Sequence, residues 1–143
     1  MRVAWKILLV GFASLPTPGI AADEVACPDA VKVQQSATAP APGWSVSYNN
    51  TPTSLEMVTF FNGPPKDEAS LVYDEWIDTK IESVATWKFP KDPRGYWIRC
   101  SYRGTTMEIA KALPSSLASC RVIYERRSAG ASGLPAIKSI ACR

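Results

Sequence analysis

Apolar and polar residues alternate along several short runs of this chain, which is the period-two pattern of strands with one buried face. In the longest run, at 96–102, Ile98, Cys100 and Tyr102 share one side and Arg99 lies on the other. Similar runs occur at 31–33, 44–48, 85–89, 107–109 and 120–124. The pattern predicts a chain built mainly of β-strands.

One stretch, 55–61, is apolar on both sides, which is typical of a central strand covered on both faces. Turn-forming residues separate the runs, at 40–43, 49–52, 62–65, 91–95, 103–105 and 130–133. The chain has 12 prolines, which leave little room for long helices. Short strands at near-regular spacing predict a mainly β fold: a single small antiparallel β-sandwich or barrel-like domain with at most short helical turns.

The segment 65–83 has an ambiguous pattern. Ala69, Val72, Tyr73 and Trp76 have helical spacing, yet 69–73 also matches a strand. We predict a strand in this segment, with at most one or two helical turns here or around 115–119.

The N-terminus has the three parts of a secretory signal peptide. Arg2 and Lys6 supply the positive start, an apolar run follows at 7–15, and small residues lead to Ala21 and Ala22. We predict cleavage after Ala22, with Ala21 as second choice, and a single β-rich domain over 23–143. The alternative is an uncleaved amphipathic first helix. The apolar run is well short of the ~20 residues that span a bilayer.

Removal of residues 1–22 lowers the number of basic residues from 16 to 14, against 13 acidic residues, so the mature net charge is +1. A nearly neutral chain gives no reason to expect nucleic acid or an anionic membrane as a partner. Cys27 follows Glu24 closely, and a charge at that place does not fit a lipoprotein signal. The export signal therefore predicts a soluble periplasmic or secreted product.

Four cysteines remain in the mature chain: Cys27, Cys100, Cys120 and Cys142. An even number of cysteines in a short exported chain favours disulfides, because the compartment is oxidising. The chain has no histidine and no Cys-x-x-Cys pair, so a metal site is not expected. We prefer Cys100–Cys120 with Cys27–Cys142; the rival pairing is Cys27–Cys100 with Cys120–Cys142, in which a hairpin brings the last two together.

The lack of histidine excludes serine–histidine and cysteine–histidine catalysis. No phosphate-binding glycine loop or dinucleotide motif is present, and no cofactor is predicted. Six acids lie close together in sequence: Asp67, Glu68, Asp74, Glu75, Asp78 and Glu82. Two carboxylates suffice for glycoside hydrolysis, but a solvated polar edge is the simpler interpretation, and we predict no enzymatic activity.

The tryptophans fall into two groups. Trp44 and Trp87 lie on the apolar side of their predicted strands and are expected in the core. Trp97 lies on the polar side of its strand, and Trp76 lies among acids, so both are candidates for contact with a partner or a sugar.

Several short motifs occur in one order along the mature chain. They are Cys27-Pro28, Phe60-Phe61-Asn62-Gly63-Pro64-Pro65, Ala69-Ser70-Leu71, the run from Tyr96 to Tyr102, Leu113-Pro114 and Cys120-Arg121-Val122. Together they resemble an uncharacterised family of small exported proteobacterial proteins, known only by an enterobacterial locus tag. The resemblance implies an exported, disulfide-containing domain; it supplies no activity and no functional residue.

These observations favour a periplasmic protein-binding module, an inhibitor or immunity protein against a peptidoglycan-targeting enzyme. A rigid, disulfide-locked scaffold binds with a small ordering cost. The predicted contact surface consists of Asn62, Asp67, Glu68, Asp74, Glu75, Trp76 and Asp78. The alternatives are a small-ligand or glycan binder that uses Trp76 or Trp97, and a structural accessory of an envelope or secretion assembly.

Overall fold

The computed structural model describes residues 25–36, 41–47, 51–129 and 135–143. The predicted signal peptide and its cleavage site lie outside the described residues. Within the described ranges the structure contains eight strands, one turn of 3₁₀ helix and no α-helix. The elements are β1 (Ala30–Val31), β2 (Thr53–Asn62), η1 (Pro65–Asp67), β3 (Glu75–Asp78), β4 (Glu82–Lys88), β5 (Tyr96–Tyr102), β6 (Glu108–Ala112), β7 (Ser119–Ala129) and β8 (Pro135–Cys142).

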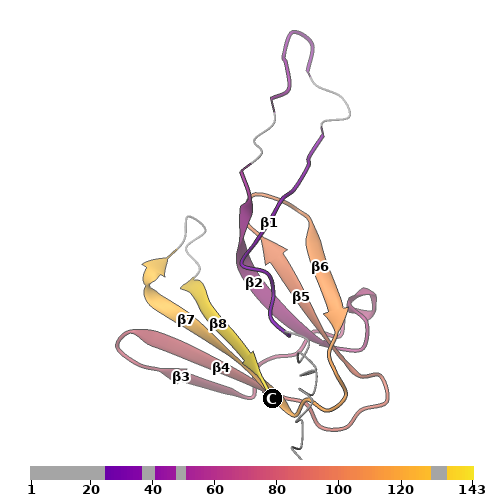
Figure 1. The fold of residues 1–143 in the computed structure, drawn as a ribbon, viewed down its shortest axis with the longest axis vertical. Coiled ribbons are helices and arrows are strands. Elements are labelled where there is room, and N and C mark those ends of the chain that lie inside the picture. Colours follow the sequence, from indigo (N-terminus) through magenta and orange to yellow (C-terminus); the bar gives the residue numbers. More distant parts are fainter. Residues whose placement is uncertain (1–24, 37–40, 48–50, 130–134) are drawn as a thin grey trace, which may run out of the picture.

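The strands form two antiparallel sheets of four strands each. The first sheet has the order β1-β2-β5-β6 and the second has the order β3-β4-β7-β8. In Figure 1 the first sheet stands upright and the second extends to the lower left, with β3 at its outer edge. The mainly β, antiparallel fold predicted from the alternating pattern is confirmed.

The two sheets share one hydrophobic core. Phe60 of β2 is fully buried, and its ring lies 4.8 Å from that of Trp87 on β4 and 5.6 Å from that of Phe89. Ile98 of β5 and Val122 of β7 belong to the same buried cluster. Because these side chains come from both sheets, burial of apolar surface between the sheets stabilises both.

Strand β2 is buried on both sides near its end. Phe60 faces the core, while Phe61 points to the opposite face and is only 2% exposed. The guanidinium of Arg99 lies 4.6 Å from the centre of the Phe61 ring. The prediction of a central, covered strand is confirmed at these positions, although Met57 on the same strand is exposed.

The disulfides pair Cys27 with Cys100 and Cys120 with Cys142. The preferred pairing from the sequence was wrong, and the rival pairing is correct. Cys120 and Cys142 are register partners in the β7–β8 hairpin, whereas Cys100 lies on β5 in the other sheet. The β7–β8 hairpin therefore determines the Cys120–Cys142 bridge, and the Cys27–Cys100 bridge joins the N-terminal segment to the first sheet.

The predicted strand at 44–48 is not observed over the described part of that run, 44–47, and Tyr48 lies outside the described residues. Trp44 is 77% exposed, so its expected place in the core was also wrong. Alternation makes a strand possible, but a strand also needs a neighbour to satisfy its backbone hydrogen bonds. The expected core position of Trp87 is confirmed.

The ambiguous segment 65–83 contains one 3₁₀ turn, η1, and the short strand β3. The strand prediction holds for β3; within 69–73 only Ser70 forms a bridge, with Phe61. A turn rather than a helix occupies 115–116. Strand β8 was not predicted, although the turn residues at 130–133 and the pairing of Cys142 are consistent with a final hairpin.

Candidate functional site

Exposed apolar side chains are concentrated on strand β3 and beside it. Strand β3 is an outer strand of the second sheet and pairs with β4. Five of the eight large hydrophobic residues that are exposed in the described chain lie on β3 or next to it: Val72, Tyr73, Trp76, Ile77 and Ile81. We call these five residues, together with Asp78 and Tyr124, the β3 edge surface.

Aromatic rings connect this surface to the core. Trp76 stacks on Tyr124 of β7 at 5.7 Å between ring centres and lies 5.2 Å from Tyr73. Tyr73 in turn meets the buried Trp87 edge-on at 6.2 Å. Trp76 is opposite Ala85 in the register, and the small alanine side chain leaves room for the indole to reach across β4. The exposed rings are therefore fixed by packing.

Asp78 anchors the end of β3. Its carboxylate accepts a hydrogen bond from the Ser83 hydroxyl at 2.5 Å and lies 3.8 Å from the guanidinium of Arg126. The bond from Ser83 lowers the pKa of Asp78 most, and a hydrogen bond from Trp76 and the charge of Arg126 lower it further, against a smaller opposing effect of desolvation. Arg126 also donates to the carbonyl of Thr79 at 2.8 Å. These contacts hold Trp76 and the β3–β4 turn in place.

A segment at 70–74 crosses from the first sheet to the second and positions Tyr73. The Leu71 N–H donates to Phe60 O at 2.8 Å, and the Leu71 carbonyl accepts from the Trp87 indole at 3.3 Å. Asp74 then bonds β4 twice: its N–H donates to Thr86 O, and its carboxylate accepts from the Lys88 N–H at 2.7 Å. The Asp74 side chain therefore has a structural role.

The structure divides the predicted contact residues among three places. Asp74, Glu75, Trp76 and Asp78 lie together at the edge of the second sheet, as the sequence suggested. Trp97 is half-buried on β5, opposite Phe61 and Ala112 in the register, on the face of the first sheet that points away from the core residue Ile98.

The remaining three predicted residues lie at the end of the first sheet. Asp67 and Glu68 are exposed in and after η1. Asn62 donates to the carboxylate of Asp92 at 3.0 Å, which ties two loops together and is the main cause of the lowered pKa of Asp92. Asn62 is thus structural, and the acids near it belong to a separate surface.

Sequence reasoning missed Tyr73 and Tyr124 as members of the surface. Tyr124 alternates with the buried residues Cys120 and Val122, which predicts an inward side chain. It does point to the inner face, and burial raises its pKa. Trp76 is opposite Ala85 and Tyr124 is opposite Ser83, so the two rings meet diagonally across two small residues of β4, a relation that depends on strand pairing.

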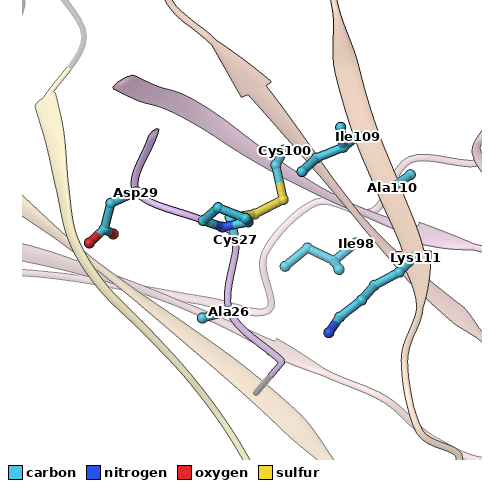
Figure 2. Close-up of a pocket in the computed structure, with 9 residues that line it drawn as sticks. Ala26, Cys27, Asp29, Ile98, Cys100, Ile109, Ala110 and Lys111 are labelled. Atoms are coloured by element: carbon cyan, nitrogen blue, oxygen red, sulfur yellow. A yellow bond between two sulfur atoms is a disulfide. The ribbon is translucent and has the colours of Figure 1, made fainter. Parts of the chain in front are cut away.

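A second candidate site is a pocket of about 570 Å³ between the N-terminal segment and strands β5 and β6 (Figure 2). The Cys27–Cys100 disulfide and the side chains of Ile98 and Ile109 form apolar walls, and Asp29 and Lys111 add one charge of each sign. Such a volume suits a small apolar ligand. None of the nine described residues that line the pocket is aromatic, so the stacking expected of a glycan site is missing.

The described residues contain no group of three or more cysteine, aspartate or glutamate residues arranged to hold a metal ion. None of their helices is long and apolar enough to cross a membrane. The β3 edge surface has the composition of a protein-binding site, with aromatic anchors surrounded by polar groups.

A family model described as Type VI secretion system Tli immunity protein matches residues 49–143. This range contains β2 to β8, the Cys120–Cys142 bridge and the whole β3 edge surface, whereas Cys27 and β1 precede it. No curated protein and no solved structure matches the chain.

Proposed function

Because the chain belongs to the Type VI secretion system Tli immunity protein family, we propose that it protects the cell that makes it by binding and blocking a secreted effector enzyme. The family match over 49–143 is the observation that carries this function. An immunity protein acts by binding, and the lack of histidine agrees with a protein that has no catalytic task of its own.

The contact with the effector lies on the β3 edge surface. Trp76 and Tyr73 are large, partly exposed and held in place by ring packing, the character of residues that dominate binding energy at interfaces. Asp78 and the segment 70–74 keep these rings in one arrangement, so binding requires little ordering of the surface.

The protein acts in the periplasm, after export through the signal peptide at 1–22. Two disulfides support an oxidising compartment, since such bonds are rare in the reducing cytoplasm. The partner is an effector that attacks the cell envelope, and peptidoglycan is the substrate class favoured by the sequence. Immunity and substrate class are separate claims, because a blocked effector could act on the wall or on the membrane lipids.

Protection in cells tests this function. Any effector encoded beside this gene is the candidate partner. It is directed to the periplasm of a sensitive strain, together with either the full chain or residues 23–143 without a leader. We expect the full chain to restore growth and the leaderless chain to leave the cells sensitive, because only the first reaches the effector. Purified residues 23–143, with disulfides formed, should bind the effector with a Kd below a micromolar.

The substrate class is tested separately with the purified effector, on peptidoglycan sacculi and on phospholipid vesicles. Release of soluble wall fragments, and its inhibition by residues 23–143, supports the proposed class. Activity on the vesicles alone would show that the effector acts on lipids and not on peptidoglycan, and it would leave the proposed immunity function unaffected. Full export of the chain with neither protection nor binding would falsify the immunity function.

A further inference from the structure

The outer side of β3 has backbone groups that point away from the sheet. Thr79 donates its N–H to Glu82 O at 2.8 Å, and the Glu82 N–H donates to the Thr79 hydroxyl at 3.0 Å, so Thr79 faces β4 as a residue of a hydrogen-bonded pair does. Hydrogen-bonded and non-hydrogen-bonded pairs alternate along an antiparallel ladder. The Asp78–Ser83 and Trp76–Ala85 pairs are therefore of the second kind, and the N–H and C=O groups of Asp78 and Trp76 point outward.

We propose that the effector is held by β-strand addition: an extended segment of the effector pairs with the outer side of β3 and becomes a fifth strand of the second sheet. This inference rests on the immunity function proposed above and specifies how the effector is recognised. Main-chain hydrogen bonds supply affinity in this mode, and side chains on alternate positions supply specificity.

Strand β3 has two of the devices that protect outer strands, since it is only four residues long and carries Glu75 and Asp78. Lysine and proline are two others. Strand β3 has neither lysine nor proline, and its two central residues, Trp76 and Ile77, are 40% and 46% exposed. Its four residues are enough for two outward-facing positions, each with one donor and one acceptor.

The side chains along the edge define the chemistry of the added strand. Trp76 and Asp78 point to one face, and Glu75 and Ile77 to the other, because successive side chains of a strand alternate. Asp78 is already paired with Ser83 and Arg126, whereas Glu75 is exposed in solvent. An added strand with apolar residues beside Trp76 and Ile77, and lysine or arginine beside Glu75, complements this edge.

A matched pair of substitutions at one position isolates the backbone contribution. Asp78→Ala removes the carboxylate, and Asp78→Pro removes the carboxylate and the outward N–H. Proline is accepted in edge strands where the N–H faces solvent, so both variants are expected to fold. We expect Asp78→Pro to bind the effector at least tenfold more weakly than Asp78→Ala. Calorimetry with residues 23–143 and a catalytically inactive form of the effector used in the protection experiment measures this difference.

Amide hydrogen exchange gives a second measurement that requires no variant. On binding of the same inactive effector to wild-type protein, the backbone amides of Trp76 and Asp78 should exchange at least tenfold more slowly, because an added strand accepts their hydrogen bonds. Unchanged exchange at both amides overturns the inference even if Asp78→Pro fails to fold.

The outcomes separate the two proposals. If the wild-type protein neither binds nor protects, the immunity function fails and strand addition fails with it. If it binds while Asp78→Pro equals Asp78→Ala and the amides are unprotected, strand addition is overturned and immunity stands. A third outcome is that two copies of this chain pair through the edge, which sedimentation would detect as a dimer. If Asp78→Pro dissociates this dimer without loss of effector binding, strand addition by the effector is also overturned.

Discussion

The two sheets have the same number of strands and the same antiparallel pairing, but they differ in how far their large apolar side chains are buried. In the first sheet the neighbours Phe60 and Phe61 are both buried, on opposite faces of one strand. In the second sheet Trp87 is buried, whereas Trp76, on the next strand outward, is 40% exposed. The difference agrees with the proposed roles, in which the first sheet is the scaffold and the second presents the binding edge.

The N-terminal segment adds a second difference between the two sheets. It is bonded to the first sheet through Cys27–Cys100, through the hydrogen bond of 3.0 Å from the Tyr102 hydroxyl to Pro28 O, and through the pairing of β1 with β2. Among the described residues, no segment pairs in this way with the outer side of β3. Covered apolar surface contributes to stability, while the exposed rings are accessible to the proposed partner.

The largest effect is expected from Phe60→Ala. The phenylalanine ring is fully buried between Trp87 and Phe89, so its loss should destabilise the fold by about 3–5 kcal/mol. Trp76→Ala, which removes a partly exposed ring of the second sheet, should cost at most about 2 kcal/mol. Denaturant unfolding of both variants measures the contrast.

Phe60→Leu serves as the control for the first variant, because it keeps most of the apolar volume and should cost less than about 1.5 kcal/mol. Equal destabilisation by Phe60→Ala and Trp76→Ala would contradict the division into scaffold and edge.

Loss of the disulfide in the first sheet should destabilise the protein more than loss of the disulfide in the second sheet. The Cys27–Cys100 bridge spans 73 residues and Cys120–Cys142 spans 22, so chain entropy predicts losses of about 4 and about 3 kcal/mol when each pair is replaced by serine. The first double variant also frees the N-terminal segment from the first sheet. Thermal unfolding of the two double variants, each with the other bridge intact, tests which loss is larger. A lower melting temperature for the variant without Cys120–Cys142 would contradict the prediction.

Much of the fold was predictable because it depends on local patterns. The alternation at 96–102 and 120–124 gave β5 and β7, and the apolar run at 55–61 gave β2, since burial of one or both faces sets the spacing of apolar residues. The run at 44–48 has the same pattern without an observed strand at 44–47. Strand formation depends on a pairing neighbour, which the local sequence does not specify.

The candidate site was predictable only in part. The acids around Trp76 indicated an exposed edge, and Asp74, Glu75 and Asp78 do lie there. Sequence proximity also suggested Asp67 and Glu68, but the crossing segment at 70–74 places them beside the other sheet. Tyr124 joins the surface through the register of β3, β4 and β7, which depends on contacts distant in sequence.

Trp76 of the second sheet and Trp97 of the first allow the contribution of each sheet to effector binding to be compared. Trp76→Ala should weaken effector binding about 30-fold, or about 2 kcal/mol, as expected for an aromatic anchor at the centre of an interface. Trp97→Ala, on the outer face of the first sheet, should change the Kd less than threefold. Calorimetry with the inactive effector measures both, and a larger loss for Trp97→Ala would move the contact surface to the first sheet.

The smallest effect is expected from titration of Asp78. This carboxylate stabilises the outer edge of the second sheet through polar contacts, whereas apolar packing stabilises the first sheet. Its pKa lies below the usual 3.8, chiefly because of the Ser83 hydroxyl. A lowered folded-state pKa gives stability that is present above the usual value and is lost as pH falls through the folded value. The melting temperature of wild type should therefore exceed that of Asp78→Asn near neutral pH, and the difference should shrink as the pH falls below 3.8.

Ser83→Ala separates this charge effect from a general loss of packing. Removal of the hydroxyl takes away the largest cause of the lowered pKa, so Asp78 should titrate closer to 3.8; the acid-sensitive stability should be smaller than in wild type, and its loss should be complete at a higher pH. Melting curves of wild type, Asp78→Asn and Ser83→Ala from neutral pH into the acid range test this order. A constant difference between wild type and Asp78→Asn throughout that range would mean that the carboxylate charge does not stabilise the edge, and that ring packing alone fixes Trp76.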